Sequence, residues 1–318
     1  MIAYLIRRVL QAIIVVWLVT VLTFVLLKLL PGGPVRAILG QRANEPALVA
    51  ALTKQLGFNQ PIWYQYWHWL DDLLHGNFGF SYQQNQTVSS LLGQRLGKTL
   101  LLLGTSTLLA LVVAVPVGVM QAVRRNKAVD YVGTTFSFVF YAMPAYLIGL
   151  ILINIFAEEL HIFPPEAAQG PGISAFFTDF NAMVLPIASL ALITIASFSR
   201  YMRSSTLDQI TQDYVRTARA KGAGERRILY RHILRNALIP IATLLGLSLP
   251  IIFSGALITE TVFNYPGMGL LFITAAGQQD YPILLGVTVI VAFATVAGSL
   301  LADILYAVLD PRVRYVSA

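Results

Sequence analysis

Six long apolar stretches, separated by polar segments, dominate the pattern of this 318-residue sequence. A helix needs about 20 apolar residues to cross a bilayer core of roughly 30 Å, and these stretches are that long or nearly so. They are residues 9–30, 100–123, 131–157, 182–198, 237–263 and 283–309. The pattern predicts an all-α, polytopic membrane protein with six transmembrane helices.

The composition agrees with this prediction. With 57% hydrophobic and 12% charged residues, the chain does not have the make-up of a soluble globular protein. We expect the first stretch to be a retained span, because the apolar region of a signal peptide is only about 7–15 residues long and no small-residue cleavage site precedes Pro31. The chain contains no cysteine, which excludes disulfides, thiolate metal sites and thiol nucleophiles.

Lysine and arginine residues in the short loops set the predicted orientation. Such cations precede the first stretch, separate the second from the third and the fourth from the fifth, and follow the sixth, whereas residues 158–181 and 264–282 contain none. Both termini are therefore predicted to be cytoplasmic. The external segment 31–99 also carries cations, but loops longer than about 60 residues translocate largely regardless of charge.

The chain divides into two predicted parts. Residues 1–95 form the first span and a large external helical segment, and residues 96–318 form a five-span core with a cytoplasmic loop at 200–236. In the external segment the pattern predicts helices over 44–55 and 61–76. The second of these has one apolar face that suits a position on the membrane interface. That face consists of Ile62, Trp63, Tyr66, Trp69, Leu70, Leu73 and Leu74.

The opposite face of the same predicted helix holds His68, Asp71, Asp72 and His75. These residue types bind metals. The polar face of any amphipathic helix collects such side chains, however, and we assign no metal site.

Most of the positive charge is concentrated in residues 200–236. This loop holds nine lysines or arginines against three acidic residues, which accounts for nearly all of the net charge of +7. After a turn at 222–224, Arg227, Arg231 and Arg235 recur at helical spacing. A basic helix of this kind either meets anionic lipid headgroups or docks another protein, and the charge pattern alone favours neither.

Residues 93–99, Gly-Gln-Arg-Leu-Gly-Lys-Thr, superficially look like a phosphate-binding loop. Only three residues separate the glycines, where the fingerprint needs four, and no strand precedes them. The stretch leads instead into a membrane helix on the external side. We therefore expect no ATP site in this chain.

Few charged residues lie inside the predicted spans. Lys28, Glu260 and Asp303 are all near span ends, where side chains can reach water. An ion-coupled secondary transporter would show inverted repeats or broken helices around mid-membrane ionisable groups. An intramembrane enzyme would need a polar cluster within the spans, which Asn154, Thr194 and scattered serines do not provide. We assign no catalytic residue.

The order of residues around Gly222 resembles a known loop. Residues 214–222 read Tyr-Val-Arg-Thr-Ala-Arg-Ala-Lys-Gly, and residues 231–240 read Arg-His-Ile-Leu-Arg-Asn-Ala-Leu-Ile-Pro. This form is similar to the coupling loop of the dipeptide/oligopeptide/nickel permease family of ABC importers, although Arg216-Thr217-Ala218 stand where importer permeases in general have Glu-Ala-Ala. The resemblance extends over nearly the whole chain, through segments 4–8, 30–32, 56–61, 259–269 and 309–315.

The resemblance implies a type I ABC importer (MetI-like) transmembrane fold in the inner (plasma) membrane. The implied partners are a homologous second permease in a heterodimer, two ATP-binding subunits and an extracytoplasmic substrate-binding protein. ATP and Mg would bind to the ATPase subunits, and this chain would hold no cofactor. Peptides are the implied cargo, with nickel, glutathione and oligosaccharides as alternatives in the same class. An ion-coupled secondary transporter is the alternative from another class.

In such importers the cytoplasmic loop would insert a short helix into a groove of an ATPase subunit, and Gly222 would provide the tight turn that lets the helix enter. The resemblance places this coupling contact on Arg216, Thr217, Ala218, Lys221, Gly222, Ala223, Gly224, Glu225, Arg226 and Arg227.

Residues 259–269 lie at the outer end of the fifth predicted span. We expect Glu260, Asn264, Tyr265, Pro266 and Gly267 to help form the external mouth, with Tyr265-Pro266-Gly267 as a rigid turn. A turn with only a structural role is an equal alternative.

Overall fold

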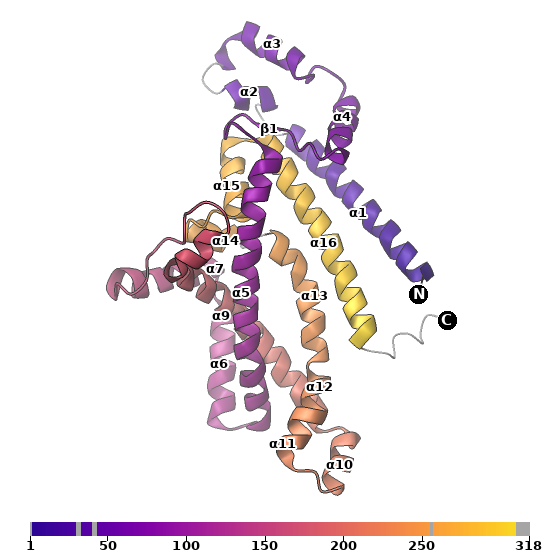
Figure 1. The fold of residues 1–318 in the computed structure, drawn as a ribbon, viewed down its shortest axis with the longest axis vertical. Helices are drawn as coiled ribbons and strands as arrows, with labels where there is room; N and C mark the ends of the chain where they lie inside the picture. Colours follow the sequence, from indigo (N-terminus) through magenta and orange to yellow (C-terminus); the bar gives the residue numbers. More distant parts are fainter. Residues whose placement is uncertain (1, 30–32, 40–42, 255–256, 310–318) are drawn as a thin grey trace.

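The computed structural model describes residues 2–29, 33–39, 43–254 and 257–309. It is an elongated bundle of helices, with a small external cap at one end and a helical hairpin at the other (Figure 1). The prediction of an all-α membrane protein is confirmed, since the strands described amount to one two-residue pair. The tail cations at 312 and 314, which support the predicted orientation, lie outside the described residues.

Four of the described helices are long and apolar enough to cross a membrane. They are α1 (Ile2–Lys28), α5 (Val88–Val123), α9 (Phe180–Ile210) and α16 (Tyr281–Leu309). These helices contain residues 9–28 of the first predicted span and all of the second, fourth and sixth.

The third predicted span is bent. The helix α6 (Ala128–Ala142) meets α7 (Ala145–Leu152) and the π-helix η2 (Ile153–Glu159) at an angle of 107°. Met143, at the bend, has an extended backbone because the ring of Pro144 disfavours the helical conformation of the residue before it. This pair counts as a fifth span only if its two arms are taken together.

The described parts of the fifth predicted span are almost entirely helical. They are the end of α12 (Leu234–Ala237), α13 (Ile239–Ser254) and α14 (Leu257–Val262). Residues 255 and 256 of this span lie outside the described residues. The predicted count of six spans is therefore not confirmed within the described residues.

The external cap contains α2 (Gly33–Leu39), α3 (Pro46–Gln55), α4 (Ile62–Leu74) and a hairpin of β1 (Phe80–Ser81) with β2 (Gln86–Thr87). The two helices predicted from the pattern, over 44–55 and 61–76, are present as α3 and α4. Gly57 and Gly76 follow them with φ of +70° and +79°, a conformation that favours glycine at helix ends.

The apolar face predicted for α4 is only partly accurate. Tyr66 is buried against Phe24 of α1 and Leu285 of α16, while Trp63 and Leu74 remain exposed. The helix α4 therefore packs against α1 and α16 through the part of its apolar face around Tyr66, and both ends of that face are exposed. Among the described residues no three metal-binding side chains converge, and His68 and His75 form separate i,i+4 pairs with Asp72 and Asp71.

The contact between α5 and α9 is the most extensive in the bundle. Ala110, Ala114 and Gly118 form a buried ridge of small residues on α5. A Cβ at Gly118 would lie 2.6 Å from the backbone oxygen of Ser199 and 2.7 Å from the Cβ of Met202. The two backbones can approach this closely because residue 118 has no side chain.

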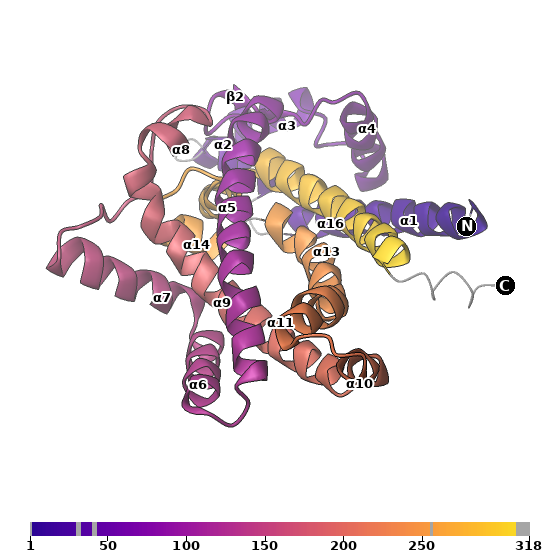
Figure 2. The same ribbon diagram turned by 60° about the horizontal axis from the view of Figure 1, so that its bottom comes forward.

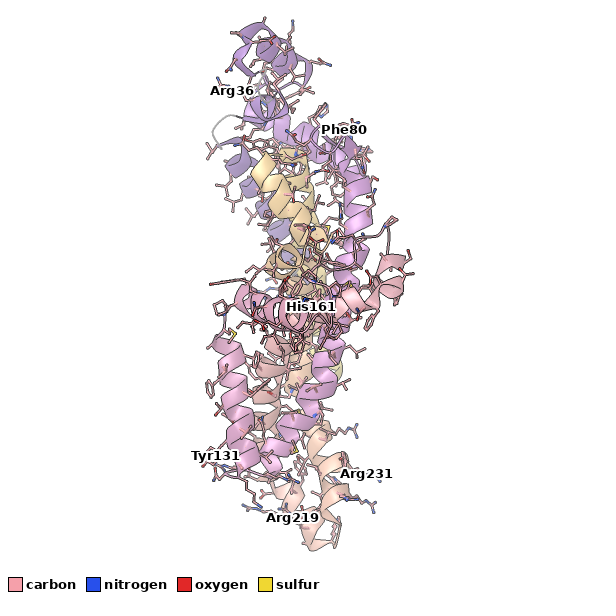
Figure 3. The ribbon with its side chains drawn as sticks, turned by 90° about the vertical axis from the view of Figure 1, so that its left-hand side faces the viewer. Arg36, Phe80, Tyr131, His161, Arg219 and Arg231 are labelled. Atoms are coloured by element: carbon pink, nitrogen blue, oxygen red, sulfur yellow. The ribbon has the colours of Figure 1, made fainter. Side chains whose placement is uncertain are left out.

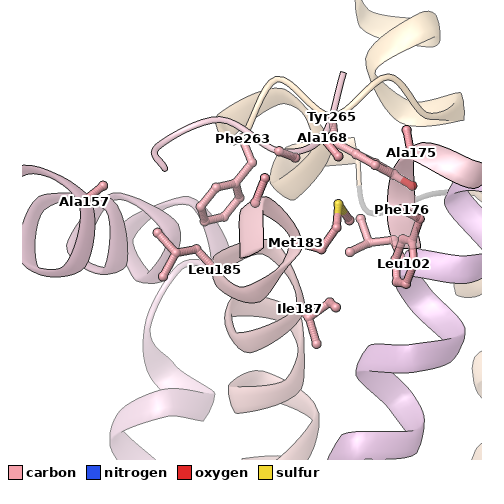
Figure 4. Close-up of a cluster of buried hydrophobic side chains, with 12 residues drawn as sticks. Leu102, Ala157, Ala168, Ala175, Phe176, Met183, Leu185, Ile187, Phe263 and Tyr265 are labelled. Atoms are coloured by element: carbon pink, nitrogen blue, oxygen red, sulfur yellow. The ribbon is translucent and has the colours of Figure 1, made fainter. Parts of the chain in front are cut away.

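At the outer end of these two helices, a cluster of buried side chains joins the segment around Phe263 and Tyr265 to α5 and α9 (Figure 4). Leu102 of α5 and Met183 of α9 belong to this cluster. The cluster positions α15 (Met268–Gln278), which follows directly in the chain.

We expect Gly118→Ala to lower the free energy of unfolding by about 1–3 kcal/mol, because the added methyl group forces α5 and α9 apart. The measurement is the thermal-unfolding midpoint of the purified chain in detergent. Gly104→Ala on the same helix is the matched control, since a Cβ there meets nothing within 4 Å, and its midpoint should be unchanged or higher. Equal midpoints for the two variants would contradict the close packing.

Candidate functional site: the basic hairpin and the external turn

The cytoplasmic loop is mostly helical and shorter than predicted. Residues 200–210 belong to α9, which continues through Arg200 and Arg203 to Ile210. The remaining loop forms a hairpin of α10 (Asp213–Ala220) with α11 (Glu225–Ile228), the π-helix η3 (Leu229–Ile233) and α12. This basic hairpin occupies the lower end of the molecule in Figure 1.

The turn of the basic hairpin is built around Gly222. The Gly222 N–H donates to the Arg219 carbonyl at 2.9 Å, and the Ala223 N–H donates to the Ala218 carbonyl at 3.1 Å. Gly222 has a φ of +78°, a left-handed conformation that glycine adopts without steric cost. Together these features form a Schellman motif, which ends α10 and reverses the chain.

Apolar packing and one ion pair hold the two arms of the hairpin together. Val215, Ile228 and Ile233 are fully or almost fully buried between the arms. The Arg219 guanidinium donates from Nε to Oε1 of Glu225 at 2.8 Å and from a terminal nitrogen to Oε2 at 3.1 Å. This ion pair lowers the pKa of the Glu225 carboxyl below its ordinary value, so the carboxylate is charged at neutral pH.

The predicted coupling residues come together on this hairpin. Ala218 and Ala223 contribute to its apolar interior. The other predicted residues, namely Arg216, Thr217, Lys221, Gly222, Gly224, Glu225, Arg226 and Arg227, are exposed. Tyr230 and Arg231 extend the exposed surface, and Figure 3 places Arg219 and Arg231 at the end of the molecule opposite Arg36. The result is a rigid, strongly basic projection.

The predicted mouth residues also come together, but they face the protein interior. Glu260 is fully buried, and Tyr265, Pro266 and Gly267 are buried as well, while Asn264 is exposed. The part these residues play in an external mouth stays a prediction. Within this chain their arrangement fixes a turn between α14 and α15.

The Glu260 carboxylate is the centre of that turn. It accepts hydrogen bonds from Thr99 Oγ1 at 2.7 Å, from the Gly269 N–H at 2.7 Å and from the Leu270 N–H at 3.2 Å. Two of these donors belong to the first turn of α15, whose N–H groups have no partner within the helix. A Cβ at Gly267 would overlap the carboxylate. The glutamate thus caps α15 and joins it to α5.

Residues near the start of α5 complete this external turn, and sequence reasoning missed them. Arg95 donates to the Pro266 carbonyl at 3.1 Å, and the Lys98 carbonyl accepts from the Tyr265 hydroxyl at 3.1 Å. Arg95, Lys98 and Thr99 all lie in the 93–99 stretch that superficially looks like a phosphate loop. The polar residues of this stretch, which directly precede an apolar membrane helix, are the feature of the sequence that indicates buried polar contacts here.

We expect Glu260→Gln to lower the free energy of unfolding by about 1–3 kcal/mol, because an amide presents a donor where the carboxylate accepts hydrogen bonds. Glu158→Gln is the matched control, since Glu158 is exposed and such surface changes stay within about 0.5 kcal/mol. Thermal unfolding of the purified chain in detergent measures both. A Glu260→Gln midpoint equal to that of Glu158→Gln would argue against the cap.

Comparison with known proteins finds relatives over the full length. The chain is 41% identical over 322 residues to the oligopeptide transport system permease protein AppB of Bacillus subtilis, covering 99% of this chain and 100% of the relative. It is 38% identical over 314 residues to a probable peptide ABC transporter permease protein of Sinorhizobium fredii, covering 98% and 99%. It is 34% identical over 315 residues to the glutathione transport system permease protein GsiC of Salmonella typhi, covering 99% and 100%.

Two family descriptions match the sequence. Residues 1–103 match the N-terminal part of the binding-protein-dependent transport system membrane component, and residues 114–315 match its inner membrane component. The basic hairpin and the external turn both lie within the second match, apart from the residues that α5 contributes before position 103. The chain therefore belongs to the family of binding-protein-dependent transport system inner membrane components.

Proposed function

We propose that this chain is the transmembrane permease subunit of an ATP-driven importer of peptides, and that its basic hairpin docks on an ATPase subunit. The observation that carries the proposal is the basic projection closed at Gly222, which lies outside the long apolar helices and exposes Lys221, Gly222 and Gly224 at its tip. Relatives named as oligopeptide and peptide permeases support peptides as the cargo. The glutathione permease relative supports glutathione, itself a small peptide, as a second candidate.

The proposed partners follow from the same argument. ATP and Mg would bind to two separate ATPase subunits, and an extracytoplasmic binding protein would deliver the substrate. A second permease would complete the pathway. Large exposed apolar side chains on α7, such as Tyr146 and Leu150, support a partner or lipid beside that helix.

The attachment of the hairpin supports a role in transmitting force. Only Thr211 and Gln212 separate α9 from α10. At the other end, Ser205 of α9 donates to the Ala237 carbonyl at 3.0 Å, and Ala237 packs against Met202. Because both ends of the hairpin are fixed to α9, a displacement of the hairpin would move this long helix as a rigid body.

The proposal is tested first by co-purification. The tagged chain, extracted in mild detergent, should bring down a second permease and ATPase subunits, identified by mass spectrometry. The double variant Arg227→Glu/Arg231→Glu should lose at least tenfold of the ATPase yield, because like charges oppose a partner that is complementary to a basic surface. The matched control is Arg124→Glu/Arg125→Glu, which makes the same charge change in the exposed loop between α5 and α6.

Two results would count against docking through the hairpin. One is an unchanged ATPase yield in the hairpin variant. The other is an equal loss in both double variants, because that would indicate a general effect of charge at the cytoplasmic side.

A second test uses the two glycines of the turn. Gly222→Ala should reduce uptake, because alanine at a φ of +78° costs about 1–2 kcal/mol and loosens the Schellman motif. Gly224→Ala is the matched control, since Gly224 has a φ of −66° and both positions have open space for a Cβ. Uptake of a radiolabelled oligopeptide by cells is the measurement, with membrane levels of the chain checked in parallel. Equal uptake by the two variants would contradict a role for this turn.

A further inference from the structure

Arg200 is a charged residue that sequence reasoning placed in the cytoplasmic loop but that lies on the membrane-spanning helix α9. It is ten residues before the end of that helix at Ile210. Its guanidinium carbon lies 4.7 Å from the ring centroid of Phe138 and 4.8 Å from that of Tyr141, both on α6. The α9 helix therefore places a cation beside the membrane-spanning helix α6.

The depth of this cation follows from α6. That helix begins at Ala128, next to the cytoplasmic cations of the preceding loop. At 1.5 Å per residue, Phe138 and Tyr141 lie about 15–20 Å along the helix from its cytoplasmic end. The cations of the preceding loop place the start of α6 at the inner membrane surface, and a hydrocarbon core is roughly 30 Å thick, so the guanidinium lies inside that core.

The side chain of Arg200 extends away from the nearer membrane surface. The hydroxyls of Ser199 and Ser137 meet at 3.0 Å and set the level of α9 against α6. Arg203, about one turn closer to the cytoplasm on α9, pairs with Asp130 near the cytoplasmic end of α6, at 2.6 Å. Arg200 instead reaches the rings further outward along α6. It does not snorkel to the cytoplasmic surface, as a lipid-facing arginine would.

Arg200 also lacks a counter-ion in the described part of the chain. No carboxylate of the described residues lies within 4.0 Å of its guanidinium. Phe138 and Tyr141 are 54% and 58% exposed, and Arg200 itself is half-buried. Figures 1 and 2 both place α6 at the edge of the bundle. An arginine at this depth needs water or an anion beside it, because lipid would cost several kcal/mol.

We propose that Arg200, Phe138 and Tyr141 form an anion subsite on the translocation pathway that binds the α-carboxylate of a peptide substrate. This inference rests on the proposed function as a peptide importer. A guanidinium binds a carboxylate through two parallel hydrogen bonds, and the two rings hold the guanidinium by cation–π contacts that leave its N–H donors free. A peptide at neutral pH supplies the carboxylate.

The contrast with Arg203 favours a transient ligand over a fixed ion pair. Arg203 is held by two hydrogen bonds to Asp130, at 2.6 and 2.9 Å, and that carboxylate is almost fully buried. Arg200, one turn away, has contacts only with the rings of two exposed aromatic residues in the part of the chain that the structure describes. The subsite also lies on the helix that leads into the basic hairpin, so a substrate bound there would move with the coupling element.

The test is uptake by the complete importer, with both permeases, ATPases and binding protein, reconstituted in proteoliposomes. Two radiolabelled probes are compared, trialanine with its free carboxylate and trialanine amide. Arg200→Gln should lower the initial uptake rate of trialanine about tenfold relative to wild type, and that of the amide less than twofold. Arg200→Lys, which keeps the charge, should retain part of the trialanine rate. Arg125→Gln, at an exposed cation outside the subsite, should change neither.

Each variant rate is divided by the wild-type rate for the same probe. This ratio cancels any preference of the binding protein for trialanine over its amide. An equal loss for both probes would overturn the subsite and indicate that Arg200 pairs with an acidic side chain of the second permease. No loss for either probe would also overturn it. If the wild type takes up neither probe, the proposed function fails and this inference fails with it.

A second measurement does not need the amide to be transported. A peptide of two alanines and a photoreactive leucine, with a free carboxylate, is illuminated with the importer arrested by vanadate. Mass spectrometry should locate the label on α6 or α9, about tenfold weaker in Arg200→Gln. Label confined to other helices in the wild type would overturn the proposal.

Discussion

The close approach of α5 and α9 is the contact on which the rest of the structure depends. A bilayer provides little hydrophobic force between helices, so two helices stay together through tight packing and polar contacts. The ridge of Ala110, Ala114 and Gly118 permits that packing. Each functional element is then attached to one end of this pair. The external turn is bonded to the outer end of α5 through Thr99, and the basic hairpin continues from the inner end of α9.

This arrangement connects the two ends of the molecule through rigid elements. The α5–α9 pair extends from the Glu260 cap at its outer end to Ile210, which is separated from the basic hairpin by two residues, and α6 is fastened to it by the Asp130–Arg203 ion pair. A force on the hairpin therefore reaches α6 and the outer turn without passing through a flexible linker. Bistable movement of packed helices is the usual basis of such coupling. The bend at Pro144 gives the outer arm, α7, a direction that differs from that of α6.

Local signals in the sequence predicted the helices, the basic hairpin and the turn at Gly222, because helical periodicity and glycine at a helix end are properties of short segments. Errors arose where distant residues decide the structure. The predicted fourth span stops at residue 198 because Arg200 and Arg203 carry charge. In the structure α9 continues through both, and Asp130, 73 positions earlier, pairs with Arg203. The sequence places Glu260 near a span end, where a side chain can reach water, but Thr99, 161 positions before it, makes that carboxylate part of the interior. No local pattern contains either pairing.

The charges within or beside the long helices differ in how completely the chain satisfies them, and that difference indicates their roles. Glu260 has three donors and Asp130 has a two-point partner in Arg203, so both groups recover the cost of leaving water through fixed contacts. A group satisfied in this way stabilises one structure and has no capacity left for a ligand. Among the described residues, Arg200 is held by ring faces alone, which stabilise its position without using its hydrogen-bond donors. A charge retained inside a membrane without a fixed partner in the described part of the chain is best explained by a partner that comes and goes, and the proposed partner in this permease is the substrate.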